Sequence, residues 1–174
     1  MAVTVFSPAA SADDWTLASD VGVVSNMSFI TSQYNNLFVP ALTGEAWWNL
    51  NTSSLNGQVV TAATFHFYVS SRTVTKNVVN LHTLEIEIGH ILFVAAGTVT
   101  PTADGWHSVT FSPLAMSYIS TSGPTRLRLT TADPGVSKWR TISIASVDSA
   151  LNVAHLDVTH EDLVLTYAST QIIN

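Results

Sequence analysis

The feature that most constrains the fold of this chain is a pair of alternating segments that flank a loop rich in turn-forming residues. Before the loop, the apolar side of the alternation consists of Ala46, Trp48 and Leu50. After the loop, the apolar side consists of Ala63, Phe65, Phe67 and Val69. Residues 51–57 between them are almost all Asn, Ser, Thr and Gly, which favour turns because they hydrogen-bond their own backbone or adopt positive φ. Since side chains alternate between the two faces of a strand, the pattern predicts one antiparallel corner of a β-sandwich.

Short segments of the same kind recur along the rest of the chain. Strands are predicted at residues 3–6, 15–18, 21–30, 37–39, 78–94, 106–111, 126–130, 139–145, 155–158 and 163–167, with a loop at 95–105 and an acidic turn at 160–162. Gly89 is expected to mark a bulge or a bend. Residues 113–119 are the best helix candidate, because Ser112 can cap a helix and Pro113 suits its first position. About ten short antiparallel strands with one short helix predict an all-β fold, a single jelly-roll β-sandwich.

The length of 174 residues suits one core and is too short for two ordinary domains. No fixed repeat or linker divides the sequence, so we expect one domain over residues 1–174. Within it, residues 1–14 and 169–174 could act as terminal arms that reach a neighbouring protein. Ile172 and Ile173 would be unusual on a solvated tail, which favours docking of the second arm.

Charged residues make up only 10% of the chain, whereas soluble domains usually contain about 25%. A surface so poor in charge predicts that partner subunits cover much of it, as in a homo-oligomer. The 12 acidic and 6 basic residues give a net charge of −6, which argues against nucleic acid as a partner because phosphate binding requires a basic surface. No segment has the roughly 18 continuous apolar residues of a membrane span, so no membrane partner is expected. The absence of cysteine excludes disulfides and thiolate metal sites.

Several of these segments together resemble DNRLRE-type jelly-roll domains. The resemblance is carried by WWNLNTSSLNGQVVTAATFHFYV at 47–69, WHSVTFSPLAMSYI at 106–119, GPTRLRLTTAD at 123–133, and the closing segments ALNVAHLDVTH and EDLVLTY at 150–167. It spans roughly residues 45–167, although the namesake hexapeptide and a proline in the closing strand are absent and the loop at 51–55 is longer than usual. Such domains resemble carbohydrate-binding modules and are frequent on phage virion proteins, including tail fibres and head decorations. The resemblance therefore implies one of these uses.

Two pairs of charged residues suggest a contact between strands. Glu85 and Glu87 share a face of one predicted strand, about 7 Å apart. Arg126 and Arg128 form a similar pair on another predicted strand. A cross-strand or inter-subunit Glu–Arg ladder is the simplest interpretation. The spacing of Glu85 and Glu87 also falls in the range of an inverting glycosidase pair, so a small glycan-active enzyme is an alternative.

The histidines are scattered along the sequence. His66 and His82 are expected to point outward from neighbouring strands, and His155 and His160 to flank the acidic turn. Because no H-x-H or H-E-x-x-H spacing occurs, the sequence predicts no metal site and no cofactor. His66 is accordingly interpreted as a surface or subunit-contact residue.

The tryptophans divide into two groups. Trp47 lies opposite Trp48 on its strand, so it could stack on a sugar, anchor a subunit interface, or pack under the loop at 51–57. Tyr68 is expected on the same polar side and shares these alternatives. The remaining tryptophans are expected in the core or at the edge of the sandwich, namely Trp15, Trp106 and Trp139.

These observations favour a non-enzymatic structural protein of a phage virion. The specific expectation is a head decoration, or cement, protein that forms a homotrimer and contacts the major capsid protein. The N-terminal residues lack the basic segment of an export signal, so the expected location is the virion, after synthesis in the host cytoplasm. The alternative is a carbohydrate-binding module or a receptor-binding fibre head with a glycan partner, which would need an exposed aromatic patch around Trp47 and Tyr68.

Overall fold

The computed structural model describes residues 1–13, 36–40, 46–72, 74–75, 78–79, 83–89, 92–131, 141–145 and 152–163. Several predicted features lie outside these residues. They are the strands at 15–18 and 21–30, nearly all of the strand at 163–167, the arm at 169–174, and the residues Trp15, His82 and Trp139.

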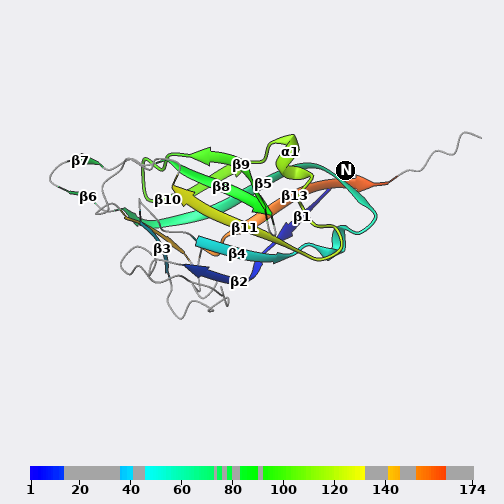
Figure 1. The fold of residues 1–174 in the computed structure, drawn as a ribbon, viewed down its shortest axis with the longest axis horizontal. Helices are drawn as coiled ribbons and strands as arrows, with labels where there is room; N and C mark the ends of the chain where they lie inside the picture. Colours follow the sequence, from blue (N-terminus) through cyan, green and yellow to red (C-terminus); the bar gives the residue numbers. More distant parts are fainter. Residues whose placement is uncertain are drawn as a thin grey trace, which may run out of the picture.

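Two antiparallel sheets face each other and enclose the core (Figure 1). Sheet A contains, in order, β1 (Ala2–Phe6), β13 (His155–Asp162), β5 (Gln58–Arg72), β12 (Thr141–Ala145) and β3 (Asn36–Pro40), while β10 (Gly105–Thr110) pairs with the opposite side of β5. Sheet B contains, in order, β2 (Pro8–Asp13), β4 (Ala46–Asn51), β11 (Pro124–Thr131), β8 (Leu84–Gly89) and β9 (Phe93–Val99). A short pair, β6 (Val74–Thr75) and β7 (Val78–Val79), stands apart. The all-β sandwich is confirmed, and its jelly-roll connectivity stays a prediction.

The alternating segments that flank residues 51–57 form the corner predicted from the sequence. β4 belongs to sheet B and β5 to sheet A, so the intervening loop carries the chain from one sheet to the other. The loop contains a 3-10 turn, η2 (Ser53–Leu55), and ends at Gly57, whose φ of 78° suits glycine. The inward residues of both strands are fully buried, and the Trp48 and Phe65 rings meet edge to face at 5.0 Å.

The predicted helix is present but short. α1 (Pro113–Met116) begins after Ser112, whose hydroxyl accepts a hydrogen bond from the Ala115 N–H at 3.2 Å. The chain leaves the helix at Ser117, whose hydroxyl donates to the Leu114 carbonyl at 2.7 Å, and it continues in turns to residue 119. No helix in the described part of the chain combines the length and the hydropathy needed to cross a bilayer.

Several local predictions are wrong. Residues 78–94 are not one strand, because they contain β7, β8 and the start of β9, and β9 runs antiparallel to β8. Residues 2–13 are not a separate N-terminal arm, because β1 pairs with β13 and β2 pairs with β4. Residues 160–162 do not form a turn, because β13 continues through them in register with β5, and a bulge after Thr159 restores the pairing. Residues 95–99, predicted as loop, belong to β9, whose small residues pair with β8 across another bulge. The sequence of β9 lacks a run of β-branched residues, so the strand depends on its neighbour more than on its own propensity.

Candidate functional site

The most distinctive group of side chains lies on the outer face of sheet A, where β10, β5 and β13 run side by side. Its members are His66 and Tyr68 of β5, Trp106 of β10, and His155 and Asp157 of β13, which we call the outer-face cluster. Four of them alternate with buried residues, and Trp106 is exposed opposite Tyr68, so all five point away from the core. Strand pairing places Tyr68 opposite Trp106 and His66 opposite His155.

Four rings of the outer-face cluster contact one another in a row. Tyr68 meets Trp106 at 5.6 Å between centroids, Trp106 meets His155 at 5.4 Å, and His155 stacks on His66 at 4.7 Å. The Trp106 ring therefore reaches across β5 to the strand beyond it. Trp106 lies on an edge strand and is 47% exposed, so it belongs to the edge of the sandwich and not to its core.

Asp157 supplies the charge of the cluster. Its Oδ2 atom lies 3.5 Å from His66 Nε2, and its Oδ1 atom lies 4.0 Å from His155 Nε2. The donor atoms of the three residues all lie within 4.8 Å of one another, which is close enough for a shared metal ion. His155 and His160 do not flank a turn as predicted, because both lie on β13. A His-x-Asp spacing was visible in the sequence, but the pairing of β13 with β5 was not.

The patch predicted around Trp47 and Tyr68 does not exist, because the two side chains lie on different sheets. Trp47 belongs to β4 of sheet B and is only 7% exposed. Its ring packs edge to face against Phe93 of β9 at 5.2 Å and beside the Arg128 guanidinium at 5.5 Å. Trp47 is therefore buried within its own chain and not available to a sugar or a partner. Tyr68 is half-buried in the outer-face cluster.

The predicted Glu–Arg contact is confirmed within the chain at one position. Arg128 of β11 is paired with Glu87 of β8, and its Nε donates to the Glu87 carboxylate at 2.6 Å. The same guanidinium stacks over the Phe93 ring at 4.6 Å. Trp47, Phe93, Glu87 and Arg128 thus contact one another on the outer face of sheet B.

Glu85 and Arg126 lie on the same outer face, but they are not paired with each other. Glu85 is opposite Thr130 in the register, and Arg126 is opposite Asn49. Both side chains are half-buried. Among the described residues, Arg128–Glu87 is the ion pair that joins β11 to β8 across the predicted ladder.

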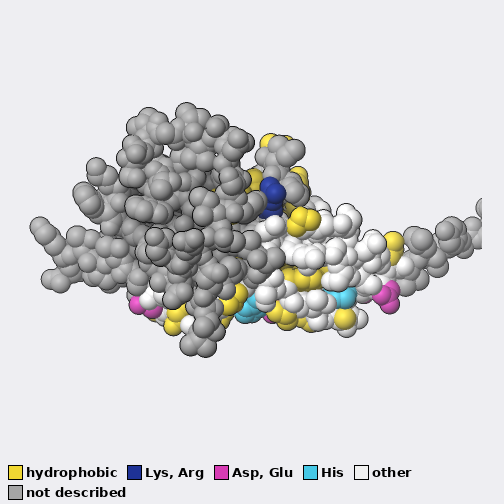
Figure 2. Space-filling view, turned by 90° about the horizontal axis from the view of Figure 1, so that it is seen from below, with side chains coloured by type: hydrophobic (Ala, Val, Ile, Leu, Met, Phe, Trp, Pro, Cys, Tyr) yellow, Lys and Arg dark blue, Asp and Glu magenta, His cyan; other side chains and the backbone are white. Residues whose placement is uncertain are grey.

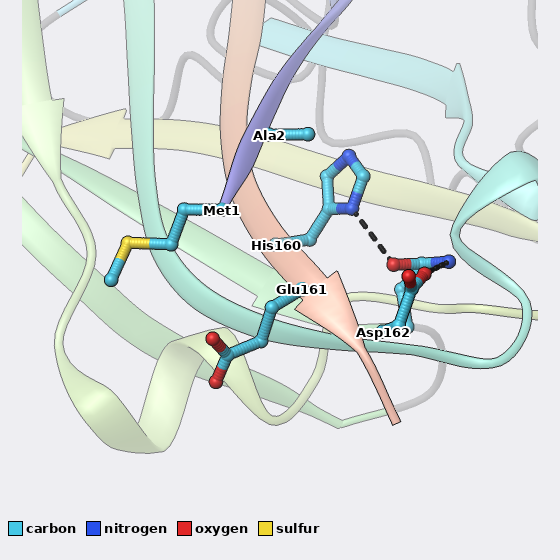
Figure 3. Close-up of a pocket in the computed structure, with 6 residues that line it drawn as sticks. Met1, Ala2, His160, Glu161 and Asp162 are labelled. Atoms are coloured by element: carbon cyan, nitrogen blue, oxygen red, sulfur yellow. Dashed lines mark hydrogen bonds between the residues drawn. The ribbon is translucent and has the colours of Figure 1, made fainter. Parts of the chain in front are cut away.

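A shallow pocket of about 240 Å³ opens where β1 begins, beside the ends of β5 and β13 (Figure 3). Its lining is Met1, Ala2, Gln58, His160, Glu161 and Asp162. Both ring nitrogens of His160 are engaged, by Thr4 Oγ1 at 2.9 Å and by Gln58 Oε1 at 3.1 Å. Gln58 in turn donates to Asp162 at 2.9 Å. His160, Gln58 and Asp162 thus form a connected set of hydrogen bonds beside the pocket, and the Glu161 carboxylate next to them is exposed.

The described part of the face shown in Figure 2 is poor in charge. Figure 2 shows hydrophobic and histidine side chains among uncharged polar ones, with only isolated charged side chains over the described part of that view. Comparison with models of known protein families and with curated proteins finds no match to this chain.

Proposed function

We propose that this chain is a non-enzymatic structural protein of a phage virion, a head decoration protein that forms a homotrimer and binds the major capsid protein. The proposal is based on the uncharged edge of sheet A, which is formed by β1. β1 has the sequence AVTVF, and its Val3 and Val5 side chains are 64% and 59% exposed. In the described part of the chain, no strand pairs with the free side of β1.

An open, apolar edge strand of this kind favours coverage by another protein. Unpaired N–H and C=O groups can extend the sheet into a neighbour, and natural monomers usually protect such an edge with charges or prolines. Val3 and Val5 face outward beside Thr159 and Asp157 of β13, so the apolar edge borders the polar outer face of sheet A. Burial of each valine would contribute about 1 kcal/mol before association costs.

The resemblance to DNRLRE-type domains supports placing this interface on a virion. Domains of that kind are frequent on phage virion proteins, including head decorations and tail fibres. A charge-poor sandwich is also suited to a lattice, where each copy is covered by several neighbours.

The proposal is tested by the native mass of the purified protein and of two matched lysine variants. Val5→Lys places a charge on the apolar edge, and Thr98→Lys places the same charge on the exposed part of sheet B. Light scattering should give a trimer for the wild type and for Thr98→Lys, and a monomer for Val5→Lys. The wild type and Thr98→Lys should also co-sediment with heads of the encoding phage. A monomeric wild type that ignores those heads would refute the proposal.

A second candidate is glycan binding, which the exposed Trp106 ring favours. Trp106 and Tyr68 meet at 79°, with polar outer-face neighbours such as His66 and Asp157 beside them. Aromatic faces bind the apolar faces of sugars, and neighbouring polar groups can fix their orientation. A glycan array should then give signals that Trp106→Ala removes, while a conservative change at the buried Trp47, Trp47→Phe, leaves them intact. No signal for the wild type would reject this candidate.

A further inference from the structure

The outer-face cluster contains two imidazoles and one carboxylate whose donor atoms converge. His66 and His155 are directly paired across β5 and β13, and Asp157 follows His155 by two residues on the same face. Their candidate ligand atoms all lie within 4.8 Å of one another. Two histidines and one carboxylate are a common ligand set for first-row transition metals, and they can leave a further coordination position open.

The hydrogen bonding of His155 suits metal binding. His155 Nδ1 lies 3.4 Å from the Val153 carbonyl oxygen, which favours the tautomer with its proton on Nδ1. The lone pair of His155 then lies on Nε2, the atom that faces Asp157. His66 also presents Nε2 to Asp157. An imidazole that donates its other nitrogen to a backbone carbonyl is the usual arrangement around bound metal ions.

Asp157 has a carboxylate oxygen that the described residues leave unsatisfied. Its Oδ1 atom is shielded from solvent and accepts no hydrogen bond within the described part of the chain. The residues opposite Asp157 in the register are Val5 and Thr64, and neither carries a charge. A buried anionic oxygen without a donor is costly, and an ion or an ordered water is the usual explanation.

We propose that His66, His155 and Asp157 bind a divalent transition-metal ion, with zinc as the best match. Zinc takes nitrogen and oxygen ligands at about 2.0 Å, so tetrahedral donor atoms lie about 3.3 Å apart. The His66–Asp157 distance of 3.5 Å is already close to this value. The His66 and His155 rings are stacked at 12°, so they must turn out of the stack to direct both Nε2 atoms at one ion, and side chains that are 29–36% exposed have room to do so. Calcium and magnesium prefer all-oxygen sites, which makes them poor matches.

This ion would connect β5 to β13 and keep a fourth coordination position toward solvent. Trp106 covers one side of His155 and supplies an apolar neighbour that limits water access. The site does not depend on the proposed virion function, because it involves no partner protein. It also revises the expectation of no metal site, which considered only ligands close together in the sequence.

Calorimetric titration of the tag-free protein with zinc chloride tests the site. The wild type should bind one ion per chain, and calcium chloride should give no signal. Each of His66→Gln, His155→Gln and Asp157→Asn should weaken zinc binding by at least about tenfold. The matched control is His107→Gln, since His107 lies on β10 and bonds the Ala103 carbonyl at 2.9 Å, outside the cluster. Absence of zinc binding, or binding that persists in a His66→Gln/His155→Gln double variant, would overturn the proposal.

A measurement on the unaltered protein covers the case in which a variant fails to fold. Zinc added to the wild type should shift the NMR resonances of the His66 and His155 imidazoles and leave those of His107 and His160 in place. Shifts at His107 or His160 in place of the paired imidazoles would overturn the assignment.

Discussion

At the scale of single residues, the Thr52 side chain holds the loop that follows β4 against the loop that precedes β11. Its hydroxyl is fully buried and lies 2.6 Å from the Ser120 carbonyl and 2.7 Å from Thr125 Oγ1. The Ser120 N–H donates back to Thr125 Oγ1 at 2.9 Å. The hydroxyls of Thr52 and Thr125 and the backbone of Ser120 thus form a closed ring of hydrogen bonds, in which each bond strengthens the others.

Replacement of Thr52 by valine should therefore destabilise the fold by about 1–3 kcal/mol, because the shape is kept but buried polar partners are left unsatisfied. Urea unfolding measures the loss as a lower midpoint at unchanged slope. Thr64→Val is the matched control, since Thr64 lies on the outer face and its 3.3 Å contact with Thr110 is exposed. Equal stability of the two variants would show that the buried ring has no net effect.

Arg128 gives a second prediction at this scale. Its guanidinium is held by Glu87 and stacked on Phe93, and the paired side chains are only 25% and 16% exposed. Arg128→Lys keeps the charge but loses the planar stacking, so it should cost about 1 kcal/mol. Arg128→Glu should cost more, because it places two carboxylates opposite each other on paired strands. Thermal unfolding should rank wild type, Lys and Glu in that order, and an unchanged melting temperature for Arg128→Lys would contradict this account.

At the scale of elements, alternation predicted the strands that have a strongly apolar inward side. β4, β5, β8 and β11 were located from such patterns, and the helix was located from Ser112 and Pro113. β9 was missed because Ala95, Ala96 and Gly97 carry little local signal and the strand is defined by its pairing with β8. The continuation of β13 was missed for the same reason, since its acidic end is held by pairing with β5.

The candidate site was only half visible in the sequence. His66 and Tyr68 were identified as outward-facing residues, and their orientation is confirmed. Trp106, His155 and Asp157 were not assigned to the same surface, because β5 is about 90 residues before β13 in the chain and no local pattern specifies that they pair. The sequence did not decide between three environments for Trp47. Alternation predicts on which face of a strand a side chain lies, but it does not predict what covers that face.

Gly89 provides a prediction for the end of β8. A side chain there would overlap the backbone carbonyl of Leu92, where the chain turns toward β9. Gly89→Ala should therefore destabilise the protein by about 2–3 kcal/mol, because backbone must move to make room. Gly123→Ala is the matched control, since a methyl group there meets its nearest atom at an ordinary 3.7 Å and should change stability by less than about 0.5 kcal/mol. Chemical denaturation would contradict this interpretation if the two variants were equally stable.

At the scale of the whole molecule, the low charge determines which force can hold copies together. The chain has only 10% charged residues, and the ion pair between Arg128 and Glu87 is internal. The two sheets also use their surfaces differently. Sheet B packs Trp47, Phe93 and Arg128 against one another on its outer face, whereas sheet A leaves Val3, Val5 and Trp106 exposed. Association through sheet A would therefore be driven by apolar burial and backbone pairing, with little electrostatic contribution.

This difference predicts how the proposed trimer responds to salt. Raising NaCl from about 0.05 M to about 0.5 M shortens the screening length several-fold, which weakens assemblies held by surface charge. The trimer should keep its mass and change its dissociation constant by less than about twofold, because its contacts do not depend on charge. Its melting temperature should rise with protein concentration, since association stabilises only the folded chain. Val5→Lys should remove that concentration dependence and keep a cooperative unfolding transition. Sedimentation equilibrium that showed a tenfold weaker trimer at the higher salt would indicate an interface built on charges, and not on the apolar edge of sheet A.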